Sequence, residues 1–291
     1  MKRLPEVLFV IFMCAGCTLN SQGEAVVPLF VAGADFSEPV MARGDVPVEL
    51  SEAKLAFGPL YLCAGASAGD LCDTARLEWL QSVVVNAMSE EPQEVGPIVG
   101  TTGPVRSYMY DLGISSQLTR DVPFILDAAA ELGDASFVVS GTATVDEIRI
   151  PFRGSLSVQQ TGDTELGVPV VRKSTSEDFS YEVREDTASL LIRFDPSAWI
   201  RGLDFQDYVT REACSDGGPG LVCDGTLERT CEGGTELSSR DCGETGQVCL
   251  PDEGCAEELV IRPDTTAHRS LRNALLTAGR PRFEWKAVPS P

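Results

Sequence analysis

Cysteine is the residue type that best equips this chain for chemistry. The 291 residues include ten cysteines but one histidine. Imidazole-based metal sites need several histidines, whereas cysteines in an oxidising compartment pair as disulfides. We therefore expect disulfides, no metal site and no cofactor. The disulfide candidates are Cys63, Cys72, Cys214, Cys223, Cys231, Cys242, Cys249 and Cys255.

A serine nucleophile is the second chemistry to consider. Residues 65–69 read G-x-S-x-G, with Ser67 at the centre. The hydrolase elbow places this serine between a strand and a helix. Here it lies between Cys63 and Cys72, which we expect to close a small loop, and the sole histidine, His268, is expected on an exposed helix position. A serine hydrolase therefore ranks last, and we predict no enzyme activity.

The charge balance excludes one class of partner. Lys plus Arg total 23 and Asp plus Glu total 44, so the net charge is -21. Such a surface repels phosphate backbones, so we expect no nucleic-acid binding. Carboxylates such as Glu177, Asp178, Glu185 and Asp186 lie in no D-x-D-x-D-G calcium loop, which favours a solvated acidic surface. A protein or glycan partner on that surface is the partner class left open.

The first residues are typical of an export signal. A basic start precedes the nine-residue apolar run Val7–Ala15, which is too short to span a bilayer. The run ends Ala15-Gly16-Cys17, which resembles the bacterial lipoprotein signal, although Cys14 stands where that signal usually has Leu. The resemblance implies acylation of Cys17, membrane attachment and, since Thr18 rather than Asp follows, the outer membrane. The alternative is an ordinary secretory signal with Cys17 as a plain thiol.

Composition divides the chain into five segments. We assign 1–16 to the signal, 17–24 to a tether, 25–209 to a β-sandwich domain, 210–257 to a cysteine-rich disulfide module, and 258–291 to a helix and strand that complete the β-domain. Short apolar or alternating runs broken by Gly, Pro and Asp predict the all-β class. The expected strands include 26–31, 46–57 with a register shift near Glu52, 77–87, an alternating run over 105–112, a hairpin 136–144/147–152, and a second pair 179–183/189–194.

One late helix interrupts the strands. Apolar residues recur on one helical face between Ala267 and Ala278, Asp264 or Thr265 is a suitable N-cap, and Gly279 is a suitable stop. A last strand is expected over 283–285. Trp79, Trp199 and Trp285 are expected in the core.

The six late cysteines predict a stapled module. They are separated by 8, 7, 10, 6 and 5 residues without a C-x-x-C pair, so zinc chelation is poorly supported and three disulfides with fifteen possible pairings are expected. Residues 231–255 resemble the small cysteine-rich modules of surface proteins from predatory soil bacteria such as myxobacteria.

The β-domain resembles the MbnP family of periplasmic, copper-related proteins. The resemblance rests on the order of Gly103–Gly113 (GPVRSYMYDLG), Phe137–Gly141, Ile150–Phe152, a strand over 188–194 and the late helix. It implies a periplasmic sandwich. That family binds copper through histidine-containing sites, but this chain has His268 alone, and Met41, Met88 and Met109 are scattered, so no site residue is transferred.

The residues together predict a non-enzymatic, lipid-anchored protein of the cell envelope, acting as a binding or scaffold module. The alternative is a copper- or metal-handling periplasmic protein.

Overall fold

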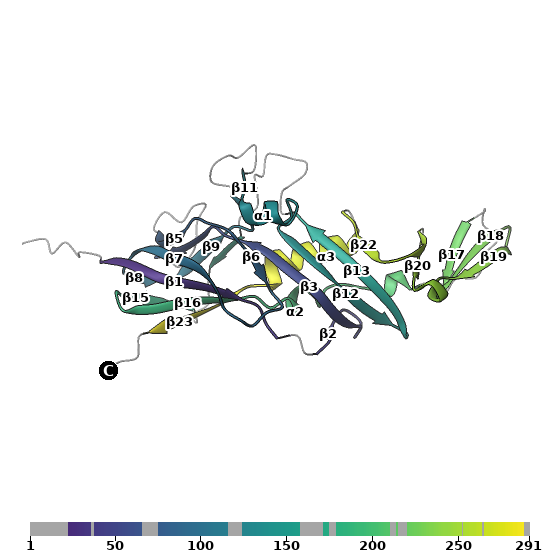
Figure 1. Cartoon of the computed structure of the whole chain (residues 1–291), viewed down its shortest axis with the longest axis horizontal. Helices are drawn as coiled ribbons and strands as arrows, with labels where there is room; N and C mark the ends of the chain where they lie inside the picture. Colours follow the sequence, from purple (N-terminus) through teal and green to yellow (C-terminus); the bar gives the residue numbers. More distant parts are fainter. Residues whose placement is uncertain are drawn as a thin grey trace, which may run out of the picture.

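The computed structural model describes residues 23–35, 38–65, 75–115, 124–157, 171–174, 179–209, 214, 220–251, 253–263 and 265–287. Two large sheets, a late helix and a small disulfide-rich module confirm the predicted fold class (Figure 1). Within these ranges, no helix combines the length and the apolarity needed to cross a bilayer.

The larger sheet has eight strands, and β1 lies parallel to β16 while the other neighbours are antiparallel. Its edges are β14 and β23. In spatial order the strands are β14 (Val171–Ser174), β9 (Ser107–Tyr110), β4 (Leu60–Cys63), β5 (Ala75–Trp79), β7 (Gln93–Thr101), β1 (Glu24–Ala32), β16 (Thr187–Arg193) and β23 (Arg282–Ala287).

The second sheet has six strands, and β6 (Val83–Asn86) joins it through β3. Along β12 buried and partly buried residues alternate, as expected for a strand with one face on a core. The other strands are β2 (Val40–Met41), β3 (Pro47–Phe57), β12 (Phe137–Val145), β13 (Ile148–Leu156) and β22 (Leu259–Ile261). The remaining elements outside the module are short. Strand β8 (Gly103–Val105) pairs with β15 (Tyr181–Val183), and β10 (Ile114–Ser115) pairs with β11 (Phe124–Ile125). The others are α1 (Asp127–Glu131), α2 (Ser197–Ile200) and the 3-10 turn η3 (Gln206–Tyr208).

One core joins the two sheets. Phe57 of β3 packs its ring against Trp79 of β5, Tyr110 of β9 and Phe194, at centroid distances of 6.0, 5.4 and 5.1 Å. Trp199 of α2 is fully buried and meets Phe137 of β12 edge-on at 4.9 Å. Aromatic rings from both sheets therefore fill the space between them, which makes the molecule a sandwich.

Two irregularities of the second sheet lie within one or two residues of the positions predicted from the sequence. The register between β12 and β3 shifts between Ser140 and Gly141, which face Glu52 and Leu50, so Ser51 is the extra residue. The β12–β13 hairpin turns at Asp146 and Glu147, both with positive φ, one residue later than expected. Positive φ at both turn residues matches the right-handed twist of the flanking strands.

Two strand predictions were wrong in detail. The segments 179–183 and 189–194 do not pair with each other: β15 pairs with β8, whereas β16 pairs with β1 and β23. The predicted alternation over 105–112 does not produce alternating exposure, because all four residues of β9 are buried. The Tyr108 ring is covered by Phe179 and Phe283, at 4.9 and 4.4 Å.

The late helix is confirmed. Helix α3 (Thr266–Asn273) continues as a π-helical turn, η5 (Ala274–Ala278), and buries Ala267, Leu271 and Leu275. Of the two predicted caps, Asp264 lies outside the described residues, and Thr265 Oγ1 accepts the His268 N–H at 3.1 Å. This bond satisfies one of the backbone donors left open at a helix start.

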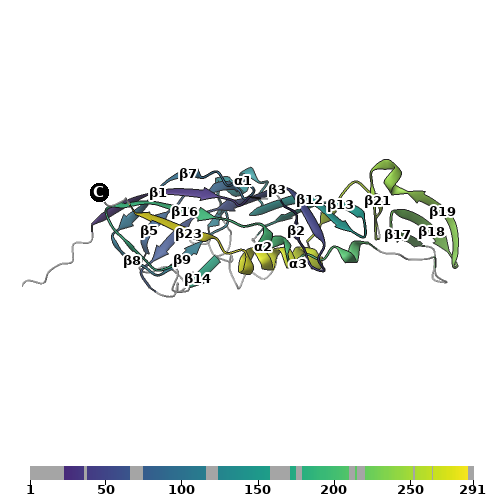
Figure 2. The ribbon, with the colours of Figure 1, turned by 90° about the horizontal axis from the view of Figure 1, so that it is seen from below.

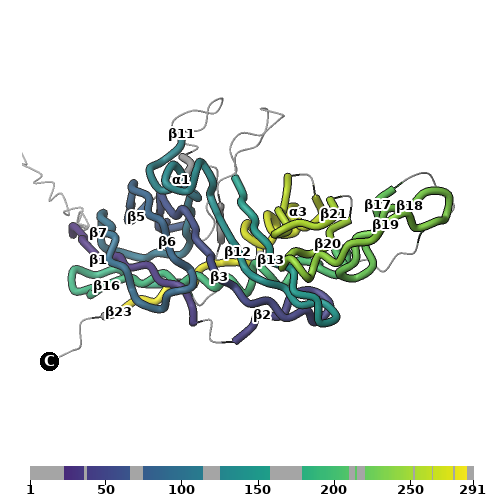
Figure 3. The backbone as a smooth tube through the Cα atoms, turned by 45° about the vertical axis from the view of Figure 1, so that its right-hand side comes forward, coloured from purple at the N-terminus to yellow at the C-terminus, as the bar shows by residue number. Residues whose placement is uncertain are grey.

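The cysteine-rich module continues directly from the second sheet. It consists of β17 (Gly220–Asp224), β18 (Leu227–Glu232), β19 (Thr235–Asp241), the 3-10 turn η4 (Cys242–Thr245), β20 (Val248–Leu250) and β21 (Gly254–Ala256). Val248 and Leu250 of β20 belong to the sandwich core, at 2% and 1% exposure. After β21 the chain returns to the sandwich (Figure 3), where β22 pairs with β13 (Figure 1).

The molecule is elongated. Strand β1 begins and β23 ends at one end of the sandwich, whereas β17, β18 and β19 lie at the opposite end of the molecule (Figures 1 and 2).

Candidate functional site

Three disulfides staple the module. Of the fifteen pairings open to six cysteines, the structure has Cys214–Cys231, Cys223–Cys249 and Cys242–Cys255, with Cα–Cα distances of 5.5, 5.7 and 5.2 Å. The last two link the η4 and β17 region to β20 and β21. The staples thus join the outer three-stranded sheet to the strands that dock on the sandwich.

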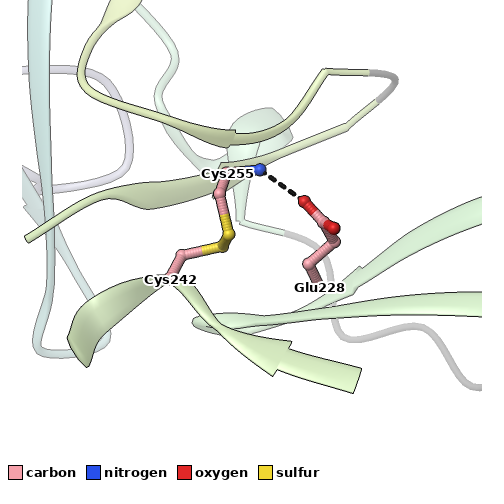
Figure 4. Close-up of side chains that lie close together, drawn as sticks. All are labelled: Glu228, Cys242 and Cys255. Atoms are coloured by element: carbon pink, nitrogen blue, oxygen red, sulfur yellow. Dashed lines mark hydrogen bonds between the residues drawn. A yellow bond between two sulfur atoms is a disulfide. The ribbon is translucent and has the colours of Figure 1, made fainter. Parts of the chain in front are cut away.

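One cluster in the module has the residue types of a metal site. Ligand-type atoms of Glu228, Cys242 and Cys255 lie within 4.8 Å of one another. The two sulfurs are bonded to each other, and Glu228 Oε2 accepts the Cys255 N–H at 2.7 Å (Figure 4). Metal ligation by cysteine requires the thiolate, so this cluster is a structural clamp. Among the described residues it is the sole trio of this kind.

The module is acidic. Residues 220–256 contain eight acidic and two basic residues, a net charge of -6. Arg229 is held by Asp224 and by Glu236, the latter at 3.1 Å, and so offers little charge outward. Strand β19 is exposed over six of its seven residues, with Leu237 60% exposed. Strand β19 is thus an exposed edge strand of the three-stranded sheet.

A small charged pocket lies where β1 ends. Its volume is about 210 Å³, and its charged lining comes from three separate segments. Arg193 ends β16, Arg282 begins β23, Asp195 follows β16, and Glu90 lies in the turn after β6. Gly33, Ala34 and the buried ring of Phe194 complete the wall. We call it the two-arginine pocket.

Backbone hydrogen bonds fix the rim of this pocket. Gly33 N–H donates to Ser89 O at 2.6 Å, and Ala34 N–H donates to Ala87 O at 3.1 Å. A side chain at residue 33 would not fit, because its Cβ would lie 2.1 Å from Ala87 O. The glycine therefore lets the 87–89 turn lie directly against the end of β1, and this turn carries Glu90.

Arg193 and Arg282 face each other across two strands. They are register partners in the β16–β23 pair. Arg193 Nε donates to Glu284 Oε1 at 3.0 Å, while Arg282 has no ion-pair partner among the described residues. Asp195 Oδ1 accepts the Ser197 N–H at 2.9 Å. The pocket thus holds two permanent positive charges and two carboxylates.

The buried tyrosines are held as neutral groups. Burial, with lesser contributions from Asp111 and Glu78, raises the pKa of Tyr61 to about 12. Burial likewise raises the pKa of Tyr110, which lies in the core beside Phe57. A phenol with a raised pKa is a poor base at neutral pH, so these side chains serve packing.

Several residues predicted from the sequence lie outside the described residues: Cys17, Cys72 and Ser67, with residues 1–16. Cys63 is disulfide-bonded. His268 lies on α3, partly exposed. Trp79 and Trp199 are in the core as predicted, and Trp285 is partly buried and stacked on Tyr181 at 4.4 Å.

Sequence reasoning did not single out the residues of the two-arginine pocket. Glu90 and Arg282 are separated by almost two hundred positions, and none belongs to a motif. The one local signal is that Arg193 and Asp195 flank Phe194 at the end of an apolar run. Their convergence depends on which strands become neighbours, which the chain order does not reveal.

Comparison with known proteins gives one structural neighbour. No protein-family model matches the chain, and no curated protein does. The solved structure described as MbnP from Methylosinus trichosporium is similar over 91% of this chain and 99% of its own, with 11% sequence identity and a TM-score of 0.32. At that level of similarity no site residue and no function are transferred.

Proposed function

We propose that this chain is a non-enzymatic lipoprotein of the cell envelope, anchored through an acylated Cys17, that holds its disulfide module away from the membrane as a binding or scaffold surface. The lipoprotein-like segment ending at Cys17 motivates the anchor. Several acyl chains at one terminus give stable attachment where a single chain does not.

The proposal rests on the positions of the start of β1 and of the module at opposite ends of the molecule. Strand β1, which begins at Glu24 soon after Cys17, starts at the end of the sandwich opposite β17, β18 and β19 (Figures 1 and 2). An anchor before β1 would therefore place the sandwich between the membrane and the outer sheet of the module. The exposed strand β19 of the acidic module would then be the part most accessible to a partner.

The test measures distances from the membrane. A fluorophore is introduced through an unnatural amino acid at residue 233, in the β18–β19 turn, or at residue 186, before β16. The acylated protein is placed in vesicles that contain an acceptor-labelled lipid. We expect weak energy transfer from residue 233 and strong transfer from residue 186. Equal transfer from both positions would contradict presentation of the module.

A separate variant tests the anchor itself. Cys17→Ala removes the acylation site, and we expect the protein to leave the membrane fraction. If the variant stays in the membrane fraction, the anchor proposal fails whatever the distances show. Mass spectrometry of the mature terminus identifies the acyl groups directly.

A further inference from the structure

We infer that the two-arginine pocket is a binding site for a small zwitterion of the α-amino acid class. The inference rests on the pocket alone and does not depend on the lipid anchor. Its first basis is the paired arginines. They lie directly opposite each other on neighbouring strands, and a guanidinium keeps its charge because it does not lose its proton in proteins.

The arginines retain donors for a ligand. Arg193 Nε is occupied by Glu284, but a guanidinium has five N–H donors, so its terminal nitrogens can still donate. Arg282 is unpaired among the described residues. Two neighbouring guanidinium groups suit a planar carboxylate, which accepts paired hydrogen bonds from such donors.

The carboxylates of the pocket select against a purely anionic ligand. Glu90 and Asp195 line the pocket beside the arginines, and Glu284 is already paired with Arg193, so the pocket carries no excess of positive charge. Asp195 uses Oδ1 for Ser197, and Oδ2 makes no hydrogen bond within the described residues. A phosphate or sulfate dianion would be repelled by both carboxylates. A ligand with an ammonium group close to its carboxylate would place the carboxylate against the arginines and the ammonium group against Glu90 and Asp195.

Size and rigidity favour a small ligand. Pockets for drug-sized molecules span roughly 300 to 1,000 Å³, whereas this pocket has about 210 Å³. The rim is fixed by the Gly33–Ser89 and Ala34–Ala87 hydrogen bonds, and Phe194 behind it is 1% exposed. Binding would therefore need no backbone rearrangement of this rim and would order only exposed side chains such as Arg282 and Glu90.

Calorimetric titration of the purified, oxidised protein tests the inference, with L-alanine as the probe. Two blocked analogues, N-acetylalanine and alaninamide, each lack one charge. We expect saturable binding of alanine at one site per chain. We expect binding at least tenfold weaker for either analogue.

Charge-removing variants locate the site. We expect Arg282→Gln and Glu90→Gln each to weaken alanine binding at least tenfold. Lys286→Gln is the matched control, because it removes a positive charge from the same strand, β23, outside the pocket. It should leave the affinity unchanged. Near-ultraviolet circular dichroism verifies that each variant keeps the packing of the sandwich.

Three results would overturn the inference. The first is the absence of saturable heat from alanine up to about 10 mM, a concentration well above the Kd of a weak specific site. The second is binding of N-acetylalanine as tight as that of alanine, which would indicate a simple anion site. The third is a loss of affinity in Lys286→Gln as large as that in Arg282→Gln, which would indicate a general charge effect.

Discussion

Gly279 and Trp199 illustrate how much a single residue can constrain. A Cβ at Gly279 would lie 1.7 Å from Trp199 Nε1, on a ring that is fully buried. The sequence suggested Gly279 as a helix stop, but its stronger role is to make room for this ring. That role could not be predicted, because the partner lies 80 positions away in the chain.

The Gly279→Ala variant is expected to be less stable by about 1–3 kcal/mol, the usual cost of an added methyl group in a packed site. Urea unfolding followed by tryptophan fluorescence measures the loss. The matched control is Gly202→Ala, because a Cβ at Gly202 meets no atom within 4 Å. Equal stability of the two variants would show that the Trp199 contact does not constrain the packing.

The raised pKa of Tyr61 predicts how the free energy of unfolding depends on pH. Its pKa is raised from 10.0 to about 12, mainly by burial, so the folded state keeps the phenol proton longer than the unfolded state. Between about pH 10 and pH 12 the folded state binds more protons, so the free energy of unfolding falls as the pH rises through this window. Below pH 10 this contribution is fully present. Denaturant unfolding of Tyr61→Phe should show a shallower fall, and an unchanged pH dependence would contradict the assignment.

Among the elements, those with local signals were predicted best. The periodicity of α3 and the alternation of β12 depend on residues a few positions apart, so the sequence revealed both. The pairing of β15 with β8 joins residues about 80 positions apart, and nothing in either short run favours it. The two-arginine pocket was missed for the same physical reason, since β1, β6, β16 and β23 must first become neighbours.

The β12–β13 turn contains a residue whose replacement by glycine should stabilise the protein. Glu147 has a φ of +70°, a region that costs a residue with a side chain roughly 1–2 kcal/mol and costs glycine almost nothing. Glycine loses more freedom on folding, so we expect Glu147→Gly to gain about 0.5 kcal/mol of stability net. Glu78→Gly, on the exposed side of β5, should lose stability. A loss in both variants, measured by urea unfolding, would mean that the turn is not under backbone strain.

At the scale of the whole molecule, the module and the sandwich share one packed core. Val248 and Leu250 of β20 contribute to the sandwich core, and the chain passes from β21 directly into β22, which pairs with β13 in the second sheet. The Arg153–Glu258 ion pair, at 2.8 Å, holds the segment between β21 and β22 to β13. A module that presents a surface at a distance benefits from this coupling, because a rigid base fixes where the surface points.

The coupling is testable because all three tryptophans lie outside the module. Tryptophan fluorescence therefore reports the sandwich alone. We expect Leu250→Ala to lower the stability of the sandwich by about 2–5 kcal/mol, since it opens a cavity in the shared core. Leu237→Ala, on exposed β19, changes the same side chain in the same module and should shift stability by less than about 0.5 kcal/mol. If Leu250→Ala left the tryptophan transition in place while the module became sensitive to protease, the two parts would unfold independently. The β19 surface would then lack a rigid base, and the proposed presentation at a fixed distance from the membrane would lose its structural support.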